Sequence, residues 1–355
     1  MRQHNKIVIN GQFANRRMTG QERFAYEVLG ELDKLVTESE NIELIVPENS
    51  TNIPHLSNIP VKKYGMAKGS LWEQTYFAFY AIIHNATTLN LCSIMPLLKP
   101  GIICIHDIDY KVNPQNFTTL YARISKIWHL LQFNWAWKFS RIILTVSEFS
   151  KKQIHDVYGV DLSRIHVVTN GWEHFERVVE DTSVKERYPA WFSKPYFFSL
   201  GSLAPQKNIE WILKVARQHP QYTFLIAGYG SLKEYGKNYQ SKDYSNVIFL
   251  GYIQDGEIKH LMRECKAFIF PSYYEGFGIP PLEALSVGAQ IIVSKTSCLP
   301  EIFEDSACYI DPYNTNVNLD ELLSTPIKNA ENILKKRRFS ETAEYIYQLI
   351  FKSES

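Results

Sequence analysis

Two glutamates are the residues whose type and spacing point most clearly to chemistry. Glu275 and Glu283 lie eight positions apart in the segment FIFPSYYEGFGIPPLEALSVGA. The apolar run Ala267 to Phe270 is typical of a buried parallel strand, and Pro281 suits the first position of a helix. The fragment is therefore predicted to form a strand, a loop that carries Glu275, and a helix with Glu283 in its first turn.

The loop between the two glutamates is predicted to come close to a ligand. Gly276 and Gly278 allow the backbone to approach a bound molecule. The free amides at the start of the following helix attract anions. A site that offers amides to phosphate and carboxylates to hydroxyl groups suits a nucleotide sugar.

A lysine in the segment GSLAPQKNIEW is a second candidate for phosphate binding. Gly201 allows a tight exit from the preceding strand, and Lys207 comes directly before a helix that Asn208 can cap. A lysine is a good point charge for a diphosphate. A solvated loop lysine is the alternative for this segment alone, but its combination with Glu275 and Glu283 favours binding.

The first half of the chain contains a comparable loop, NGQFANRRMTGQERF. Its candidate residues are Gly11, Arg16, Arg17, Gly20 and Arg23. Thr19 or Gly20 is expected to open a helix whose amides form a second anion site. The fingerprint G-x-G-x-x-G is absent, which counts against a dinucleotide-dependent dehydrogenase.

The segment IICIHDIDY places His106 and Asp107 at the carboxyl end of an apolar strand. A histidine in such a place is often structural, but a position at a ligand cleft favours contact with a sugar hydroxyl. Asp107 is expected either to hold the histidine tautomer or to cap the loop.

The elements that position these residues alternate between strand-like and helix-like segments. Strands are expected at KIVIN, IELIVP, TTLNLCS, IICIHD, RIILTVS and RIHVVTNG, and later at YFFSLG, YTFLIAG, VIFLGY, AFIFPS, QIIVS and ACYID. Helices are expected between them, which predicts two parallel, doubly wound sheets. Each binds ligands at the carboxyl ends of its strands, so the chemistry is expected in a cleft between two domains. The polar stretch ERVVEDTSVKERYPAWFSKP is predicted to be the crossing linker, and the tail NILKKRRFSETAEYIYQLIF to be helical and amphipathic.

Composition excludes several classes of protein. The chain has 355 residues, 45% of them hydrophobic, which is enough for two ordinary domains. With 38 basic and 37 acidic residues, the net charge of +1 does not favour a nucleic-acid partner. The five scattered cysteines are expected to be reduced, and no signal peptide or membrane span is visible. We expect a cytoplasmic protein, with possible peripheral contact at the inner face of the cell membrane.

An aromatic segment bears on that membrane contact. WHLLQFNWAWKFSR combines tryptophan and phenylalanine with flanking cations, a pattern that suits a headgroup interface. Aromatic residues on a helix against a sheet are usually core, so most are expected to be buried and a minority to face a membrane.

These motifs together resemble those of the retaining glycosyltransferases of the GT-B fold, family 4 (glycosyl transferases group 1). The segment EGFGIPPLE fits the family's E-x7-E pattern, and the other matching segments follow in the family's order: MTGQERF, IHD, TVSEFS, VVTNG, GSLAPQKN, FLIAGYG and VIFLGYI. The resemblance covers nearly the whole chain. It implies an α/β fold of two Rossmann-like domains facing each other across a cleft, with a final helix that crosses back to the first domain. The expected limits are 1–171 with 336–355 for the acceptor-side domain and 172–335 for the nucleotide-sugar domain.

The resemblance also implies roles for individual residues. Glu275 is expected to lie against the donor sugar, Glu283 to bind the ribose, Lys207 and the loop amides to hold the diphosphate, and His106 to approach the donor sugar. The catalytic candidates are His106, Glu275 and Lys207. The donor-binding candidates are Gly20, Arg23, Ser202, Lys207, Gly228, Ile253, Glu275, Gly276, Phe277, Gly278, Ile279 and Glu283. Base selection is expected to depend on the loops Tyr229 to Leu232 and Gly251 to Ile253.

One residue departs from the family pattern. Many members carry an arginine five positions before the lysine, where this chain has Ser202. Either Arg16 or Arg23 compensates, or the pyrophosphate is held mainly by amides. No metal and no cofactor are expected.

Three functions are consistent with these features. The leading one is a metal-independent hexosyltransferase that moves a sugar from a nucleotide sugar to a glycan or lipid-linked glycan in bacterial-type surface polysaccharide synthesis. The alternatives are a nucleotide-sugar epimerase of the same fold and an inactive donor-binding partner subunit. The identity of the base, the sugar, the acceptor and the oligomeric state is left open.

Overall fold

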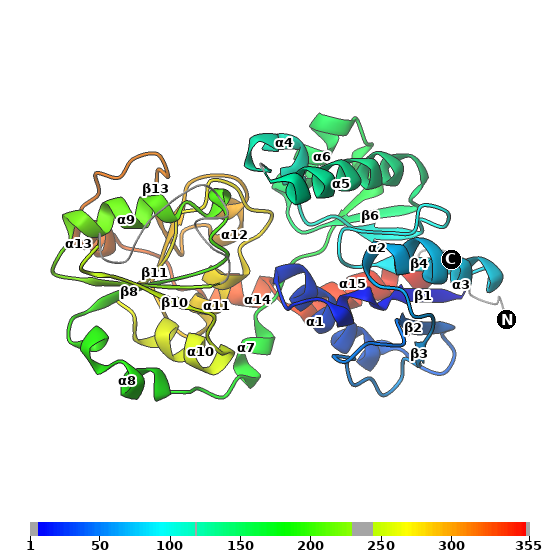
Figure 1. Ribbon diagram of the computed structural model, residues 1–355, viewed down its shortest axis with the longest axis horizontal. Helices are drawn as coiled ribbons and strands as arrows, with labels where there is room; N and C mark the ends of the chain where they lie inside the picture. The colour runs from blue at the N-terminus through cyan, green and yellow to red at the C-terminus, as the bar shows by residue number, and fades with distance from the viewer. Residues whose placement is uncertain (1–5, 118, 229–243, 353–355) are drawn as a thin grey trace. The chain divides into compact units, whose positions relative to one another are not determined.

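The computed structural model describes residues 6–117, 119–228 and 244–352 (Figure 1). The chain divides into two compact units. Unit 1 comprises Met1–Asn170 and Arg338–Ser355, and unit 2 comprises Gly171–Arg337. Each unit is built on one parallel β-sheet, which confirms the predicted fold class.

Unit 1 contains a seven-stranded sheet with the order β3-β2-β1-β4-β5-β6-β7, and all neighbouring strands are parallel. The strands are β1 (Ile7–Asn10), β2 (Ile42–Val46), β3 (Val61–Lys63), β4 (Thr87–Asn90), β5 (Ile102–Cys104), β6 (Ile142–Thr145) and β7 (Ile165–Val167). Most are short runs of buried aliphatic residues, as expected for strands covered on both faces.

The helices of unit 1 follow these strands in chain order. They are α1 (Gly20–Leu35), α2 (Gly69–Trp72), α3 (Ala78–Ile83), α4 (Asp109–Val112), α5 (Leu120–Phe139), α6 (Glu148–Tyr158) and α15 (Phe339–Phe351). The π-helical segment Glu73–Phe77 joins α2 to α3. The widened turn places the buried carboxylate of Glu73 beside the end of β1.

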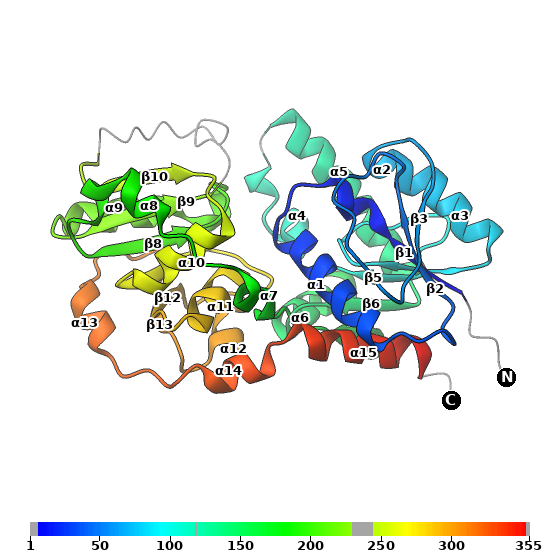
Figure 2. The same ribbon diagram turned by 90° about the horizontal axis from the view of Figure 1, so that it is seen from below.

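The last helix of the chain belongs to unit 1, which confirms the predicted return of the C-terminus. In both views α15 runs beside α1 (Figures 1 and 2). The rings of Phe24 and Phe339 lie 6.4 Å apart, and the Thr342 hydroxyl donates to the Thr169 carbonyl at 2.7 Å. The tail is not one helix, because α14 (Glu331–Lys336) ends in unit 2 before α15 begins.

Strand β3 was missed in the sequence. Val61, Lys62 and Lys63 form the edge strand of the unit 1 sheet, and all three are exposed. A three-residue edge strand with two lysines has neither the apolar content nor the alternation that predicts a strand, and lysine is a common protection of sheet edges.

Unit 2 contains a six-stranded parallel sheet with the order β10-β9-β8-β11-β12-β13. The strands are β8 (Tyr196–Leu200), β9 (Thr223–Ala227), β10 (Val247–Gly251), β11 (Ala267–Phe270), β12 (Ile291–Ser294) and β13 (Cys308–Ile310). The strand order reverses between β8 and β11, which is where open parallel sheets bind ligands. The loops that follow β8 and β11 are therefore neighbours.

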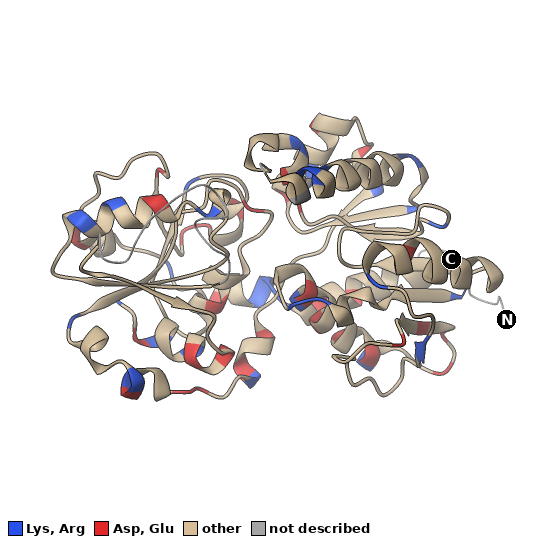
Figure 3. Cartoon of the chain, in the orientation of Figure 1, with Lys and Arg blue, Asp and Glu red and all other residues tan. Residues whose placement is uncertain are grey.

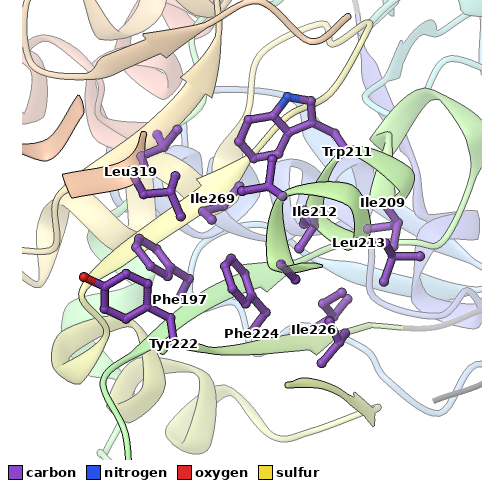
Figure 4. Close-up of a cluster of buried hydrophobic side chains, with 14 of the residues drawn as sticks. Phe197, Ile209, Trp211, Ile212, Leu213, Tyr222, Phe224, Ile226, Ile269 and Leu319 are labelled. Carbon is purple, nitrogen blue, oxygen red and sulfur yellow. The ribbon is translucent and has the colours of Figure 1, made fainter. Parts of the chain in front are cut away.

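The helices of unit 2 cover both faces of this sheet, with α9 on one face and α10 on the other (Figure 1). They are α7 (Glu173–Arg177), α8 (Ser183–Arg187), α9 (Ile209–Gln218), α10 (Asp255–Glu264), α11 (Ile279–Ser286), α12 (Leu299–Phe303), α13 (Leu319–Ser324) and α14. Figure 4 shows the core between α9 and the sheet, where Trp211 and Ile212 meet Phe197, Phe224 and Ile269. This core fixes the start of α9, and with it Lys207.

The stretch predicted to be a crossing linker is instead part of unit 2. It contains α8, and the segment before α8 is tied to α10 by a buried lysine. The ammonium group of Lys259 donates to the carbonyls of Phe175 at 2.8 Å, Glu176 at 3.3 Å and Val178 at 2.8 Å. A polar sequence can still pack firmly when its backbone carbonyls are satisfied in this way.

Two general expectations can be compared with the structure. The five cysteines are free, and all but Cys265 are buried. Across the described residues, every helix is too short or too polar to cross a bilayer.

Candidate active site

The central feature of unit 2 is an ion pair between two residues predicted from the sequence. Lys207 lies in the short 3-10 turn Pro205–Lys207 after β8, and Glu275 lies in the loop after β11. The Lys207 ammonium is 2.6 Å from a carboxylate oxygen of Glu275, and their side chains are 23% and 11% exposed. Lys207 also lies over the ring of Phe270, 5.3 Å from its centroid. The structure thus brings together two residues that are far apart in the sequence.

The two loops that carry this pair are fastened to each other. The Asn208 side-chain amide donates to the carbonyls of Pro271 at 3.0 Å and Pro312 at 2.9 Å. The Tyr273 amide donates to the Gln206 carbonyl at 2.8 Å. Asn208 is the N-cap residue of α9, as expected, but it adopts a left-handed conformation and its side chain bridges loops instead of bonding to the helix.

The loop after β12 supports the backbone around Glu275. The Glu275 amide donates to the Ser297 hydroxyl at 3.2 Å, and the Cys298 thiol contacts the carbonyls of Glu275 and Phe277, each at 3.3 Å. Because Phe277 is also buried, this loop is held from several sides before any ligand arrives.

Gly278 forms the entrance to α11 with a φ of 103°. A β-carbon at this position would lie 3.0 Å from a methyl group of Leu299, so both the backbone conformation and the packing require glycine. Gly276, Phe277, Gly278 and Ile279 thus form one rigid turn that leads into the helix.

The start of α11 differs from the prediction by two residues. The helix begins at Ile279, so Pro280 and Pro281 occupy the second and third positions. Glu283 therefore lies in the second turn, and the first turn carries no acidic residue. An N-terminus without a carboxylate in its first turn is better suited to an anionic ligand than the predicted one.

Glu283 has a partner that the sequence analysis missed. His174 from α7 approaches it, with 2.7 Å between the imidazole Nε2 and the carboxylate oxygen Oε1. Both residues are buried. The two lie 109 positions apart, and α7 falls in the stretch next to the supposed linker, so no local signal pointed to the pair.

Three glycines close the ends of consecutive strands in this sheet. The Gly201 amide donates to the Ala227 carbonyl at 3.1 Å, and the Gly228 amide donates to the Gly251 carbonyl at 2.8 Å. Gly228 has a φ of 142°, and a β-carbon there would lie 1.7 Å from the Gly201 carbonyl oxygen. Ser202 follows in the same loop and is half-buried, where many relatives of the resembled family carry an arginine.

Ile253 lies beside a separate small pocket. The pocket has a volume of about 250 Å³ and is lined by residues of α8, of α10 and of the segments next to them, among them Arg187, Tyr188, Tyr252, Ile253 and Glu257. The other loop expected to select the base, Tyr229 to Leu232, lies outside the described residues.

In unit 1, His106 lies directly beyond β5 and is held in the protein interior. Its ring Nε2 is 2.9 Å from the Leu91 carbonyl, its amide donates to the Ser93 hydroxyl at 3.3 Å, and its ring stands edge-on to Phe24 at 4.9 Å. Burial lowers the pKa of His106, so the ring is neutral and Nε2 carries the proton donated to Leu91. Nδ1 is then the nitrogen that can accept a hydrogen bond.

Asp107 caps the loop before α4 and does not hold the tautomer of His106. Its carboxylate accepts the amide of Asp109 at 3.0 Å, which caps the loop before α4. The tautomer of His106 is set by the Leu91 carbonyl. Sequence alone gave no reason to select that carbonyl.

Arg16 is engaged by acidic residues of its own unit. Its guanidinium donates to Gln12 at 2.8 Å and lies 3.4 Å from Glu73 and 3.7 Å from Glu22. Burial opposes the charge of Arg16, but Glu73 and Glu22 outweigh it and raise its pKa. Arg16 is therefore a structural cation, which weakens the idea that it compensates for Ser202.

The predicted anion site at Gly20 carries a carboxylate. Gly20 is the first residue of α1, and the Glu22 carboxylate accepts the amide of Thr19 at 3.2 Å. Arg23, in the same turn, is half-buried and has interactions within the structure. A carboxylate at a helix start competes with a bound anion, so this site is less suited to phosphate than the start of α11.

A buried polar cluster at the ends of β1 and β4 was also missed. The Asn10 side-chain amide donates to Asn90 at 3.1 Å and to Glu73 at 3.2 Å. Burial raises the pKa of Glu73 against the opposing effect of Arg16. An asparagine at the last position of two apolar strands was the available signal for this cluster.

The expectation of metal independence overlooked an Asp-x-Asp pair, Asp107 and Asp109, after β5. The Asp109 carboxylate accepts the Asn113 side-chain amide at 2.7 Å, and the Asp109 backbone amide donates to the Asp107 carboxylate at 3.0 Å. Within the ranges that the structure describes, no three His, Cys, Asp or Glu side chains are grouped as a metal site would require.

The predicted residues thus fall into two groups, each placed by one sheet. Lys207 and Glu275 lie in loops that follow strands of unit 2, and Glu283 lies in α11 of the same unit. Ser202, Gly228, Ile253 and the turn 276–279 also belong to unit 2. His106, Gly20 and Arg23 lie in unit 1. In unit 2 the arrangement offers an ammonium group, a helix start without an acidic side chain in its first turn, and two carboxylates, one in a loop and one in α11.

Both halves of the chain are similar to known glycosyltransferases. The model of the glycosyl transferases group 1 matches residues 185–344, and that of Glycosyltransferase Family 4 matches residues 18–174. The O-antigen chain mannosyltransferase B of Escherichia coli is 28% identical over 57% of this chain and 57% of its own length. The O-antigen chain mannosyltransferase RfbU of Salmonella typhimurium is 29% identical over 67% of this chain and 63% of its own length.

A solved structure shows the same fold. Anabaena HepE, crystallised with UDP and glucose, superposes with a TM-score of 0.69 over 98% of this chain and all of its own, at 16% identity. The two family models together span most of the chain and divide at the same region as the two units. The two matches together support a glycosyltransferase of the family 4 type, and the structural likeness shows the GT-B fold.

Proposed function

We propose that this protein is a retaining hexosyltransferase. It moves a sugar from a nucleotide-sugar donor to a glycan or lipid-linked glycan acceptor in bacterial-type surface polysaccharide synthesis. The observation that carries the proposal is the Lys207–Glu275 ion pair, which lies at adjoining strand ends of the sheet in unit 2.

The leaving group presents the main difficulty of such a reaction. A nucleoside diphosphate must accept negative charge as the bond to the sugar breaks. Preorganised donors aimed at that charge stabilise the transition state, and removal of one such donor typically costs about 3 kcal/mol. Lys207 and the amides of the turn at Phe277 and Gly278 are the groups proposed for this role.

The ion pair gives Glu275 and Lys207 linked roles. Without a donor, each side chain satisfies the charge of the other. A bound diphosphate would attract Lys207, and Glu275 would then be available to accept hydrogen bonds from sugar hydroxyl groups. We assign Glu275 to sugar binding, and we do not assign it as a covalent nucleophile.

Glu283 is proposed to bind the ribose with the help of His174. The contact with His174 occupies Oε1 of the carboxylate and fixes its orientation. The carboxylate can then accept the ribose hydroxyls through its remaining lone pairs. For His106, contact with the donor sugar would use Nδ1 as an acceptor, since Nε2 donates to Leu91.

The diphosphate is proposed to be held without the usual arginine. Ser202 contributes no charge, and Arg16 is paired with Glu22 and Glu73. Lys207 and the α11 amides therefore carry most of the electrostatic stabilisation. We further propose that no divalent cation is required, so a chelator should leave turnover unchanged.

The choice of substrates rests on relatives. The two bacterial relatives named above are mannosyltransferases of O-antigen chains, which supports a hexosyl donor and a surface-glycan acceptor. HepE binds UDP and glucose, which supports a nucleotide-sugar donor. Peripheral contact with a membrane surface would bring the enzyme to a lipid-linked acceptor.

The test is incubation with UDP-, GDP- and dTDP-hexoses, with and without a lipid-linked glycan acceptor. Donor consumption that requires the acceptor supports the proposal. Isomerised donor in the absence of acceptor would indicate an epimerase, and tight donor binding without any turnover would indicate an inactive partner subunit. Either result would contradict the proposal.

A further inference from the structure

The longest helix of unit 1 has an apolar face that the described residues of its own unit leave exposed. One face of α5 packs on the sheet through Phe133, Ala136 and Trp137, which are buried. The other face exposes six large apolar side chains. These residues, here called the α5 stripe, are Leu120, Ile124, Ile127, Leu131, Trp135 and Phe139.

The α5 stripe is continuous along the helix. Its members are three or four positions apart, so they share one face. The helix has 20 residues, which corresponds to a length of about 30 Å. Ile127 is 64% exposed and Leu120 is 75% exposed, far above the usual exposure of such side chains in a monomeric protein.

The stripe adjoins a second apolar feature on unit 1. An open groove of about 480 Å³ is lined by Tyr64, Tyr76, Phe79, Ile82 and Leu98. Leu98 itself is 73% exposed.

Hydrogen bonds tie the groove to the stripe. The Trp135 indole donates to the Leu97 carbonyl at 2.7 Å, and the Leu97 amide donates to the side chain of Gln74 at 2.9 Å. Trp135 belongs to the stripe and Gln74 lines the groove, so the two features form one apolar surface on unit 1.

The part of the chain that forms this surface contains more basic than acidic residues. Between Glu73 and Glu148 the only acidic residues are Asp107 and Asp109. The same interval contains the basic residues Lys99, Lys111, Arg123, Lys126, Lys138 and Arg141. Figure 3 shows lysine and arginine along α5 and no acidic residue in that helix. The whole chain is almost neutral, so this is a local concentration of positive charge.

We propose that the α5 stripe and the adjoining groove dock on an anionic phospholipid bilayer. Aliphatic and aromatic side chains flanked by cations are the composition of an interfacial helix that lies in the plane of a membrane. The cationic side chains can reach the phosphate layer while their stems cover apolar surface. A second copy of the chain is a poorer occupant, because a two-fold interface would place the cations of one copy against those of the other.

This inference extends the proposed function by placing the enzyme where a lipid-linked acceptor resides. It does not depend on sugar transfer, because binding to vesicles requires no donor. Membrane docking and sugar transfer can therefore be disproved independently of each other.

The test is flotation of the full-length protein with vesicles of phosphatidylcholine alone or of phosphatidylcholine and phosphatidylglycerol in equal parts. We expect binding to the anionic vesicles that weakens with added salt. The double variant Ile124→Glu/Ile127→Glu should lower the vesicle partition coefficient at least tenfold, because it replaces two exposed apolar groups that the bilayer would bury with two negative charges.

A second variant tests the cations separately. Arg123→Gln/Lys126→Gln should lower binding to anionic vesicles about fivefold for each cation removed, since one basic residue near such a surface contributes about 1 kcal/mol. Matched controls lie in unit 2: Val179→Glu and Lys335→Gln change an exposed apolar and an exposed basic residue, and should leave binding unchanged.

Circular dichroism and nucleoside diphosphate binding show whether each variant is folded. The proposal is overturned if the wild-type protein does not float with anionic vesicles, or if the stripe variant floats as well as the controls. A wild type that does not float and forms a dimer that the stripe variant dissociates would identify a second copy of the chain as the occupant of this surface.

Discussion

The Lys207–Glu275 pair leads to a prediction in which two substitutions act in opposite directions on nucleotide binding. In the unliganded protein the lysine is already paired, at 2.6 Å. A diphosphate must therefore compete with Glu275 for the same ammonium group. Glu275→Gln keeps the shape of the side chain and removes the competing charge, whereas Lys207→Met removes the ammonium group for which the diphosphate and Glu275 compete.

The size of each effect follows from burial. The side chains of Lys207 and Glu275 are 23% and 11% exposed, so the pair is neither fully exposed nor fully buried. Fully exposed pairs contribute about 0.2 to 1 kcal/mol, and disruption of a buried pair costs about 3 to 5 kcal/mol. Glu275→Gln is expected to strengthen nucleoside diphosphate binding by up to about fivefold, close to 1 kcal/mol. Lys207→Met should weaken it by at least about tenfold, because a hydrogen bond to a charged group contributes about 1.5 to 3 kcal/mol.

Isothermal titration calorimetry with UDP, GDP and dTDP measures both effects without requiring turnover. Lys214→Met is the matched control, because Lys214 is paired with Glu210 at 3.0 Å on the surface of α9. Sugar transfer should be lost in Glu275→Gln although the nucleotide binds more tightly. Equal weakening of nucleotide binding by Glu275→Gln and Lys207→Met would refute the reasoning, since the glutamate would then support the diphosphate and not compete with it.

Three further predictions concern stability. Gly228→Ala should lower the melting temperature by several degrees or prevent folding, because the added β-carbon would overlap a carbonyl oxygen. Gly30→Ala should raise the free energy of unfolding by about 0.5 to 1 kcal/mol, because Gly30 lies in a helix with open space around it. Burial opposes ionisation of Glu40, but hydrogen bonds from a nearby threonine and Tyr347 outweigh this effect and lower the pKa of Glu40 to about 2. The contribution of Glu40 to stability is therefore present above pH 4.5 and is lost as the pH falls towards 2. Tyr347→Phe should reduce this acid-dependent loss, as measured by urea titrations at different pH values. Burial lowers the pKa of His106, so unfolded chains bind a proton more readily and stability should fall as the pH drops below about 6.5; an unchanged slope in His106→Gln would contradict this.

The sequence was sufficient to predict the fold because most strands are short apolar runs followed by turn residues. The sheet strands at Ile7–Asn10, Ala267–Phe270 and Ile291–Ser294 are of this kind. The features that it failed to predict depend on tertiary contacts. Val61–Lys63 is a strand only because it extends the edge of the unit 1 sheet beside β2.

Several residues of the site were predictable from sequence motifs, but the contacts between them were not. The family motif identified Lys207 and Glu275 separately, but their contact requires that β8 and β11 be neighbours, which chain order does not reveal. The contact of His174 with Glu283 depends on the packing of α7 against α11, which no local pattern encodes. The start of α11 was misjudged because Gly278, and not the proline pair, ends the loop.

The most direct test of the central claim is the anomeric configuration of the product. The wild-type protein should convert an α-linked nucleotide hexose and a glycan acceptor into an α-linked glycoside, with one nucleoside diphosphate released for each sugar transferred, as followed by proton NMR. Formation of a β-linked glycoside, or no release of nucleoside diphosphate with any donor and acceptor in the panel, would contradict the account.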